Sequence, residues 1–280
     1  MGAETDVRAR RAFLEQARLL TPYLVTDYEG TVFVIPTNAD KRFFVKRGRK
    51  DLRMLDHAVS TLRHAGRLEL QTFVDVGAHI GTTTISALAQ HGFSHAVAIE
   101  PDPGNVRLLR ANAALNGLHE RISIVAAGIS DTHGSAWFLP GDPERGPCYW
   151  TKGSIVPEPT EGALEIELVT LELLAERGSV TPKKTGLLWL DCQKREGEAL
   201  RAASPFLEHH VPIVFALRAL YLSPRSPFLD ALGATYGTFV DLRRKPSDDL
   251  TTPWKPVFES LDELLERRAG KKALTDVLVF

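Results

Sequence analysis

From Thr72 onward, short apolar runs alternate with segments that carry helix signals, and this alternation constrains the fold more than any other feature. Parallel strands cannot be joined by tight turns, since each connection needs a crossover of a dozen or more residues, usually a helix. The pattern therefore predicts an α/β fold, a Rossmann-like, doubly wound sheet of seven strands that is mostly parallel, with the last strand antiparallel. The apolar runs are FVDVG, AVAIE, ISIVAA, GLLWLDC, PIVFAL, GTFVDL and DVLVF.

The composition is that of a globular chain with enough apolar residues for a substantial core. Its 280 residues are 44% hydrophobic, and 34 Lys and Arg nearly balance 35 Asp and Glu, for a net charge of −1. A nucleic-acid-binding domain is usually strongly basic, and this chain gives no such electrostatic signal. The near-neutral balance favours a small or uncharged partner, and we expect neither nucleic acid nor a membrane.

Cysteine usage and the first residues of the chain bear on the compartment. The two cysteines, Cys148 and Cys192, are too few for a disulfide-stapled secreted fold. The first 16 residues lack the apolar core of a signal peptide, and no apolar run is long enough for a membrane span. We therefore expect a cytoplasmic protein with free thiols.

Residues 1–66 precede the alternating region and form an α+β extension. We expect a helix from Thr5, as its N-cap, to about Leu20, and a second helix over residues 51–64. Between them lie three strand-like runs, YLVT, TVFVIP and RFFVK. The extension is expected to cap the substrate pocket or to join two copies in a homodimer, with residues 67–280 as the main domain.

Residues 134–170 interrupt the alternation of strands and helices. Prolines and glycines are interleaved between Pro140 and Gly162, and two strand-like runs flank them, so we expect an excursion from the sheet and not a domain boundary. Tyr149 and Trp150 are candidate substrate-binding residues, because an aromatic loop near the strand ends can close over a ligand. The alternative is a loop that only packs on the surface.

The loop after the first strand of the main sheet is the first place to look for a site, because open α/β sheets bind ligands beyond the carboxyl ends of their strands. In this loop Gly77 permits a tight turn, and Gly81 has no Cβ to block a ligand. The spacing is G-x-x-x-G. A dinucleotide fingerprint needs a further glycine where this chain has His79, so the cradling of a pyrophosphate loses support.

Two carboxylates indicate which ligand the loop holds. Glu100 ends the second strand about 20 residues after Gly81, where an acidic side chain can reach the hydroxyls of an adenosine ribose. Sites for nicotinamide cofactors and for S-adenosylmethionine share this feature. Asp75 favours S-adenosylmethionine, because the methionine part of that molecule carries an ammonium with which a carboxylate can pair. The alternative is a strand-turn-helix corner without a ligand.

These segments resemble the FkbM family of class I S-adenosylmethionine-dependent methyltransferases. The resemblance spans about residues 73–207, in VDVGAHIGTTT, AIEPDPGNVRLLRANAALNG, ISIVAAGISD and VTLELLAE leading to WLDCQKREGEAL. Members typically methylate hydroxyl groups of natural products or glycans, which implies that S-adenosylmethionine is converted here to S-adenosylhomocysteine. The resemblance implies cofactor contacts at Asp75, Gly77, Ala78, His79, Gly81, Glu100, Pro101, Asp102, Ala127 and Gly128.

The chain departs from the family pattern at one position after the fourth strand. The family usually reads D-x-E/Q-G-x-E there; Asp191, Gln193 and Glu196 match, but Lys194 stands where glycine is usual. The lysine either loses a turn of positive φ or brings a cation to the mouth of the substrate site. The alternative is a solvated residue at a helix start. Gln193 and Lys194 are thus candidate substrate-binding residues.

Transfer of a methyl group to a hydroxyl requires an aligned acceptor oxygen and a group that takes its proton. Asp191 is the first candidate base, although it could serve only to orient the cofactor. The other candidates near the strand ends are Glu196, His79 and the pair His209 and His210.

We expect no metal, because catechol-type methyltransferases carry ligands after the fifth strand, where this chain has Arg218. The leading hypothesis is an O-methyltransferase that acts on a small-molecule or glycan hydroxyl. One alternative is a methyltransferase-like subunit that binds the cofactor but has lost the chemistry, a hypothesis that Lys194 motivates. The other is an oxidoreductase with a nicotinamide cofactor.

Overall fold

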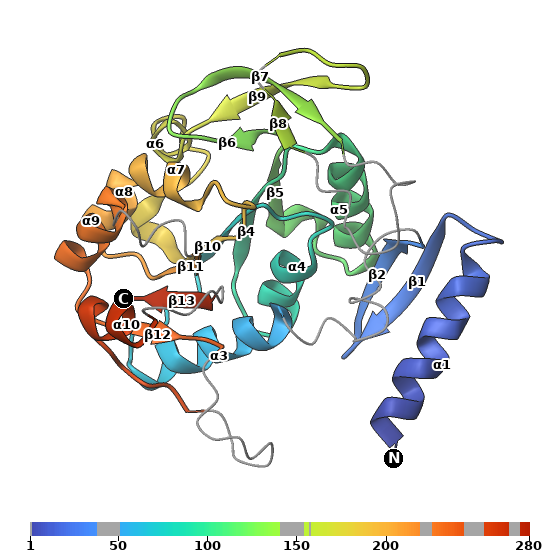
Figure 1. The fold of residues 1–280 in the computed structure, drawn as a ribbon, viewed down its shortest axis with the longest axis horizontal. Coiled ribbons are helices and arrows are strands. Elements are labelled where there is room, and N and C mark those ends of the chain that lie inside the picture. Colours follow the sequence, from blue (N-terminus) through green and yellow to red (C-terminus); the bar gives the residue numbers. More distant parts are fainter. Residues whose placement is uncertain are drawn as a thin grey trace.

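The computed structural model describes residues 2–37, 51–140, 154–156, 158–218, 226–243, 255–268 and 275–280. Its centre is a seven-stranded sheet in the order β12-β13-β11-β10-β3-β4-β5 (Figure 1). The neighbours from β11 to β5 are parallel, whereas β13 is antiparallel to both β11 and β12. The expected fold class is confirmed. The strands are β3 (Thr72–Val76), β4 (His95–Ile99), β5 (Ile122–Val125), β10 (Thr185–Leu190), β11 (Ile213–Leu217), β12 (Phe239–Asp241) and β13 (Thr275–Val279).

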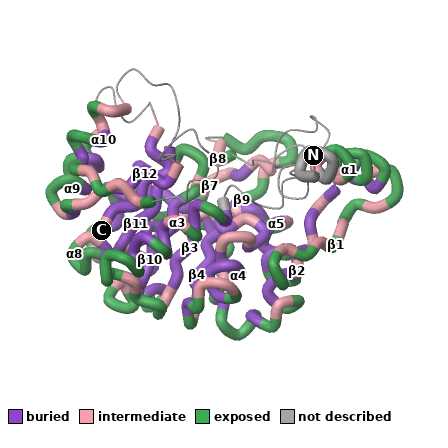
Figure 2. The backbone as a smooth tube through the Cα atoms, turned by 90° about the horizontal axis from the view of Figure 1, so that it is seen from below, coloured by how far each residue is buried: buried purple, intermediate pink, exposed green. Residues whose placement is uncertain are grey.

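The central strands are buried on both faces, which explains their continuous apolar sequences. Every residue of β10, β11 and β13 is buried. Figure 2 shows buried backbone in the central strands and exposed backbone along the N-terminal helix. Among the described residues, no helix combines the length and the apolarity that crossing a membrane would require.

Helices cover both faces of the sheet, so it is doubly wound. One face packs against α3 (Asp51–His64), α4 (Thr82–Ala89) and α5 (Pro103–Leu115), in a core that includes Leu55, Ile85 and Leu109. The other face packs against α6 (Leu171–Glu176), α7 (Glu196–Arg201), α8 (Ser204–Glu208), α9 (Pro227–Thr235) and α10 (Leu261–Arg268). Two short 3₁₀ helices, η1 (His119–Arg121) and η2 (Pro182–Lys184), precede β5 and β10.

Local signals set the start of two helices. The Asp102 side chain accepts hydrogen bonds from the backbone N of Gly104 (2.7 Å) and Asn105 (3.3 Å), with Pro103 in the first turn of α5. At α10, the Glu263 carboxylate accepts a hydrogen bond from Ser260 N (2.7 Å), and Glu263 N donates to Ser260 Oγ (3.3 Å), which is a capping box.

The sequence pattern of residues 196–207 predicts one helix, but the structure divides this segment in two. It forms α7 and α8, with a break at Ala202 and Ala203. Pro205 explains the break, because a proline within a helix removes a hydrogen bond to the preceding turn and clashes with its carbonyl. In α8 the proline instead occupies the first turn, where its missing N–H costs nothing.

The N-terminal extension contains helix α1 (Gly2–Ala17) and a hairpin of β1 (Tyr23–Tyr28) and β2 (Thr31–Pro36). The helix starts before Thr5, so the predicted N-cap is wrong; Ala3 and Glu4 are good helix formers that extend it. Glu29 and Gly30 both have positive φ, as a two-residue hairpin turn requires. The run RFFVK lies outside the described residues.

Asn112 of α5 and Asn116, the C-cap of this helix, attach the hairpin to the main domain. Asn112 accepts a hydrogen bond from Val34 N (2.7 Å) and donates to Val34 O (3.3 Å). Asn116 does the same with Val32 N (2.9 Å) and Val32 O (2.7 Å). The two side-chain amides thus bond to the edge of β2 as a neighbouring strand would. Whether residues 1–66 cap the pocket or join two copies stays a prediction.

The excursion of residues 134–170 contributes to a second sheet with the order β6-β9-β7-β8. In Figure 1 this sheet lies beyond the end of the central strands, beside α6 and α7. Its strands are β6 (Gly128–Ile129), β7 (Gly134–Leu139), β8 (Ser154–Val156) and β9 (Leu164–Val169). Cys148, Tyr149 and Trp150 lie outside the described residues.

Candidate functional site

A pocket of about 470 Å³ opens at the carboxyl ends of β3, β4, β5 and β10. A volume of this size is typical of sites for small molecules and cofactors. One wall comes from the second sheet, through Phe138, Ser154 and Ile155. The remaining walls come from the loops that follow the central strands, where parallel sheets usually bind ligands.

The loop after β3 can form only with glycine at position 77. Gly77 has a φ of 88°, and a Cβ added to it would lie 2.4 Å from the backbone oxygen of Asp191. The two loops are also joined by a hydrogen bond from Asp191 N to Val76 O (3.0 Å). Gly77 N and Ala78 N both donate to Ile99 O, at 2.9 and 3.0 Å, so the turn is fixed to β4.

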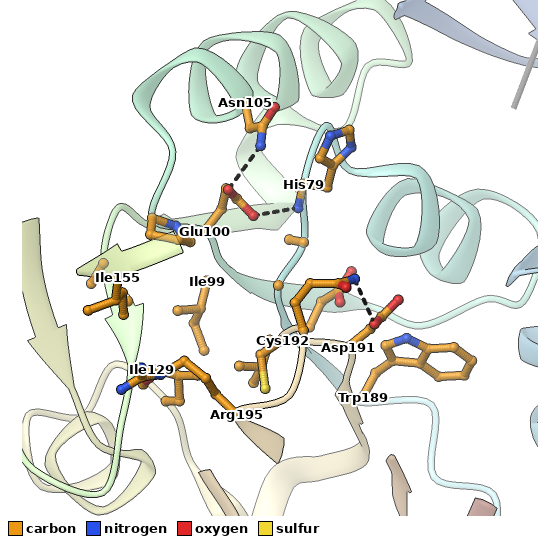
Figure 3. A pocket seen from close by; sticks show the side chains of 18 of the residues that line it. His79, Ile99, Glu100, Asn105, Ile129, Ile155, Trp189, Asp191, Cys192 and Arg195 are labelled. Carbon is orange, nitrogen blue, oxygen red and sulfur yellow. Dashed lines mark hydrogen bonds between the residues drawn. The ribbon is translucent and has the colours of Figure 1, made fainter. Parts of the chain in front are cut away.

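Glu100 presents a buried carboxylate at the end of β4 (Figure 3). One oxygen accepts hydrogen bonds from Asp102 N and Asn105 Nδ2, both at 3.0 Å, and the other accepts one from His79 N at 2.9 Å. Burial raises the pKa of Glu100, and these hydrogen bonds counteract part of the rise. A carboxylate has about four acceptor sites, so it retains capacity for a ligand hydroxyl.

Asp75 is a second buried carboxyl group, near the other end of the pocket. Its Oδ2 accepts a hydrogen bond of 2.6 Å from Thr84 Oγ1. Burial raises the pKa of Asp75 to about 7, the Thr84 bond opposes the rise, and the negative charges of Asp191 and Glu100 add to it. A cationic group in the pocket would relieve this repulsion, so the environment of Asp75 favours a positively charged ligand.

Asp191 follows β10 and is an exposed residue that lines the pocket. Its Oδ1 accepts a hydrogen bond of 3.2 Å from Gln193 Nε2 (Figure 3). Trp189 lies two residues earlier on the same face of β10 and in register with Asp75 of β3. Asp75, Trp189 and Asp191 therefore form one end of the pocket, opposite Glu100.

A family comparison decides what this arrangement belongs to. The profile described as Methyltransferase FkbM domain matches residues 75–245, which contain all the strand ends that form the pocket. This chain belongs to the FkbM methyltransferase family. The resemblance inferred from the motifs is confirmed, and the chain is assigned to the S-adenosylmethionine-dependent methyltransferases.

Solved structures with similar folds include FkbM methyltransferase from Methylobacillus flagellatus, at 16% identity and a TM-score of 0.44, over 99% of this chain and 60% of that one. A protein from Pyrococcus horikoshii designated a transferase has 14% identity and a TM-score of 0.49, over 98% and 83% of the two chains. TYW2 of P. horikoshii, crystallised with MeSAdo, has 15% identity and a TM-score of 0.44, over 98% and 83%. No curated protein sequence matches this chain.

In this FkbM domain, all the cofactor residues named from the sequence line the pocket except Gly81 and Asp102. Gly81 has a φ of 88°, and a Cβ there would lie 2.2 Å from Leu109 Cδ1, so glycine allows α5 to pack closely against this turn. Asp102 caps α5 and directs its oxygen at the backbone of that helix. The residues that do line the pocket are Asp75, Gly77, Ala78, His79, Glu100, Pro101, Ala127, Gly128 and Asp191.

The candidate bases of the FkbM domain separate by position. Glu196 is fully buried, is not a pocket residue, accepts a hydrogen bond from Lys194 N (3.2 Å) and pairs with Arg218 (3.3 Å). His79 lines the pocket, but burial lowers its pKa to about 3, so its imidazole is a weak base. His209 and His210 precede β11 at the amino-terminal edge of the sheet, away from the pocket. Asp191 is the candidate carboxylate that lines the pocket.

The left-handed turn at position 194, where the family usually has glycine, is present here with lysine. Gln193 and Lys194 have φ angles of 56° and 83°, and both line the pocket. The first consequence considered for Lys194, loss of the positive-φ turn, does not occur. Tyr149 and Trp150, the other predicted substrate-binding residues, lie outside the described part of the chain.

Several lining residues were not identified from the sequence. Asn105 could have been found, because it follows the cap Asp102 by one turn and so faces the end of β4. The period of two along a strand would have placed Trp189 on the same face as Asp191. Nothing local marks Phe138, Ser154 and Ile155, which β7 and β8 of the second sheet supply. The missed residues are Val76, Thr82, Thr83, Ile99, Asn105, Ile129, Phe138, Ser154, Ile155, Trp189, Cys192, Arg195 and Glu198.

Two further features concern metal and thiol chemistry. In the part of the chain that the structure describes, no group of three or more His, Cys, Asp or Glu side chains is arranged to hold a metal ion. The Cys192 thiol lines the pocket, and burial raises its pKa well above the usual value, with the charges of Glu196 and Asp191 adding to the effect. A thiol of this kind is a weak nucleophile at neutral pH.

Proposed function

We propose that this protein is an S-adenosylmethionine-dependent O-methyltransferase that acts on a hydroxyl group of a small-molecule natural product or a glycan. The observation that carries the proposal is the Glu100 carboxylate, held by His79 N and Asn105 Nδ2 at one end of a pocket whose other end contains Asp75. The Glu100 carboxylate would accept hydrogen bonds from the ribose hydroxyls, and the Asp75 carboxylate would pair with the ammonium at the other end of the cofactor.

The residues present fit S-adenosylmethionine by chemistry and by space. Glu100 and Pro101 would hold the ribose, Ala127 and Gly128 would lie beside the adenine, and Asp75 would face the ammonium. Two neutral, apolar contacts suit a flat purine ring better than charged groups do. When bound, the cofactor supplies a sulfonium methyl group, whose bond to sulfur breaks as the acceptor oxygen bonds to the carbon, leaving its electron pair on sulfur.

Asp191 is assigned as the base that takes the proton of the acceptor hydroxyl. It lines the pocket and is exposed, so an acceptor can reach it, while its hydrogen bond from Gln193 Nε2 fixes the orientation of the carboxylate. The remainder of the catalysis comes from holding the acceptor oxygen in line with the methyl group. No step in this proposal uses a metal.

The proposal extends to partners and compartment. We propose a small-molecule or glycan acceptor and no nucleic acid, supported by the balance of 34 Lys and Arg against 35 Asp and Glu. A cytoplasmic location is proposed from the use of only two cysteines. A homodimer is proposed from the cluster of exposed apolar side chains in the N-terminal extension, which includes Leu19, Leu20 and Val25.

Calorimetry with S-adenosylhomocysteine tests the cofactor part of the proposal. The wild type is expected to bind, and Glu100→Gln is expected to bind roughly tenfold to hundredfold more weakly, because the carboxylate accepts charge-assisted hydrogen bonds that an amide cannot replace. Glu165→Gln, an exposed change on β9, is the matched control. The proposal fails if the wild type does not bind, or if Glu100→Gln binds as tightly as the control.

The acceptor part needs a separate test. The protein is incubated with radiolabelled S-adenosylmethionine and a panel of hydroxylated natural products and oligosaccharides, and labelled products are treated with mild base. Methyl ethers survive this treatment and methyl esters do not. Base-labile label alone, or label on nitrogen, would contradict O-methylation of a hydroxyl. Turnover of any acceptor would exclude a subunit that has lost the chemistry.

A further inference from the structure

Asn112 is a fully buried polar side chain that joins three segments of the chain. Its Oδ1 accepts a hydrogen bond from Val34 N (2.7 Å), and its Nδ2 donates to Val34 O (3.3 Å) and to Ile80 O (2.9 Å). An asparagine side chain has one carbonyl and two N–H donors, so both donors of Asn112 are in use. The three segments are α5, the N-terminal hairpin and the cofactor loop, which is residues 77–81.

The hairpin decides which way the Asn112 amide points. A backbone N–H can only donate, so the atom that faces Val34 N must be the carbonyl oxygen of Asn112. The NH₂ group is thereby directed at Ile80 O, which accepts from it. Phe33 and Ile35 of the same strand belong to the buried core that also contains Ile80. The edge of the hairpin is therefore fixed relative to the cofactor loop.

The bond from Asn112 reaches a strained part of the cofactor loop. His79 has a φ of 53°, in the left-handed region that a residue with a Cβ seldom adopts. Its backbone N donates to Glu100 Oε2 (2.9 Å), and the carbonyl of the next residue, Ile80, accepts from Asn112. Strained conformations persist only where the surroundings enforce them. The two hydrogen bonds, on either side of His79, supply part of that constraint.

One face of α5 serves both the Glu100 carboxylate and the cofactor loop. Asn105, near the start of the helix, donates to Glu100 Oε1 at 3.0 Å (Figure 3), and Asn112 follows Asn105 by two turns. Residues at this spacing lie on the same face of a helix. The helix therefore holds the carboxylate with one asparagine. With the other it holds the loop whose His79 N also bonds to that carboxylate.

We propose that Asn112 is a positioning residue for the cofactor, although it does not itself line the pocket. Its bond to Ile80 O keeps His79 N on the Glu100 carboxylate, and so keeps that carboxylate oriented towards the ribose hydroxyls. Without this donor the loop is free to relax from the positive φ at His79, and the bond from His79 N to Glu100 weakens. The inference rests on the proposed function and adds to its cofactor site a residue from outside the pocket.

Asn116 offers a matched control. Its side chain repeats the pattern one turn later, since Oδ1 accepts from Val32 N (2.9 Å) and Nδ2 donates to Val32 O (2.7 Å). Its other bond goes to Asn112 O within α5 (2.7 Å) and not to the cofactor loop. Both asparagines thus attach the same hairpin by two hydrogen bonds, and they differ in the contact with Ile80 O.

The test is calorimetry of the full chain with S-adenosylhomocysteine, together with hydrogen exchange of the backbone amides. Asn112→Ala is expected to bind roughly tenfold more weakly than the wild type, because a buried carbonyl loses its donor. Asn116→Ala should bind as the wild type does. Amide exchange in Asn112→Ala should accelerate in residues 77–81 but not in β11, because the loosening is local.

Asn112→Asp is the second variant. It keeps the size of the side chain and the acceptor for Val34 N but has no amide donor, so it removes the bond to Ile80 O without opening a cavity. We expect the same loss of affinity and the same local rise in exchange as in Asn112→Ala.

The outcomes separate this inference from the proposed function. If the wild type does not bind S-adenosylhomocysteine, the proposed function fails. If the wild type binds and the Asn112 variants bind as tightly, the inference alone is overturned. Equal losses in Asn112→Ala and Asn116→Ala would also overturn it, since attachment of the hairpin would then explain the effect. So would exchange that accelerates as much in β11 as in residues 77–81, which would mean a general loss of stability.

Discussion

The backbone oxygen of Asp191 lies 2.4 Å from the position that a Cβ on residue 77 would take. The loops after β3 and β10 meet there without a side chain between them, and the same contact brings the candidate base beside the cofactor loop. The contact between the two loops thus depends on the absence of a Cβ at position 77.

Replacing Gly77 with alanine is expected to disrupt this contact. A φ of 88° costs an L-residue about 1–2 kcal/mol, and the clash with backbone adds to that cost. We expect urea denaturation to show a loss of about 3 kcal/mol or more, with loss of S-adenosylhomocysteine binding. Gly30→Ala is the control, because Gly30 has a φ of 79° with nothing within 4 Å. Equal losses in the two variants would show that the contact with Asp191 does not matter.

Asp75 is expected to make stability fall as pH rises from about 4 to 7. Its pKa is raised to about 7 in the folded protein, above an unfolded value of about 3.9, so the folded state binds more protons in this range. Its contribution is fully present below pH 4 and is lost as pH approaches 7, by roughly 4 kcal/mol at most. Urea denaturation of wild type and Asp75→Asn across this range measures the difference.

The buried Asp241 provides a contrast of opposite sign. Burial would raise its pKa, but hydrogen bonds from Thr275 and Arg268 outweigh burial and lower it. Its contribution is present above about pH 4 and is lost as pH falls further. Asp241→Asn should therefore alter the unfolding free energy at acid pH.

For Asp75 the contradicting outcome lies at higher pH. If the unfolding free energies of the wild type and of Asp75→Asn ran parallel between pH 4 and 7, the pKa of Asp75 would not be raised.

Cofactor binding should release protons near pH 7. An ammonium beside Asp75 favours its ionised form, so a carboxyl group that is about half protonated at pH 7 loses its proton when the ligand binds. Calorimetry with S-adenosylhomocysteine in buffers of different ionisation enthalpy measures the number released. Asp75→Asn should abolish the release. Proton uptake by the wild type would mean that the ammonium lies elsewhere.

Lys194→Gly is expected to stabilise the fold. Glycine adopts a φ of 83° without strain, a gain that exceeds the extra entropy of glycine in the unfolded chain. We expect a gain of about 0.5–1 kcal/mol in unfolding free energy. Lys184→Gly, at a residue without positive φ, should lose stability instead. Destabilisation by both changes would show that the Lys194 side chain has a structural role that outweighs its strain.

The N-terminal extension is expected to mediate association of two copies. Residues 13–25 contain Phe13, Leu19, Leu20, Tyr23 and Val25, which are most of the large apolar side chains exposed in the described chain. Sedimentation should show a dimer that Leu20→Ser shifts towards monomer. Leu115→Ser, an exposed change on α5, is the control. A monomeric wild type at all concentrations would reject this prediction.

The sequence predicted the parts of this fold that depend on neighbouring residues. The helix over residues 51–64 and the apolar strands β3, β4 and β10 follow from short-range patterns, and these strands place Glu100 and Asp191 at strand ends. Contacts between segments that are distant in the chain could not be predicted from the sequence. The packing of Leu109 from α5 against Gly81 could not be seen in the sequence, because the two residues are far apart in the chain. Phe138 and Ile155 likewise line the pocket because β7 pairs with β8. Such contacts depend on chain geometry that no local pattern encodes.

Helix α5 connects the N-terminal hairpin to the pocket. One end holds Glu100 through Asn105, and the other end holds the hairpin through Asn112 and Asn116. At 1.5 Å per residue, Asn105 lies about 10 Å along the helix axis from Asn112 and about 16 Å from Asn116. Asn112 also donates to Ile80 O, at 2.9 Å, so the cofactor loop is tied to the same rod. The hairpin and the Glu100 end of the pocket are thus held by the same helix.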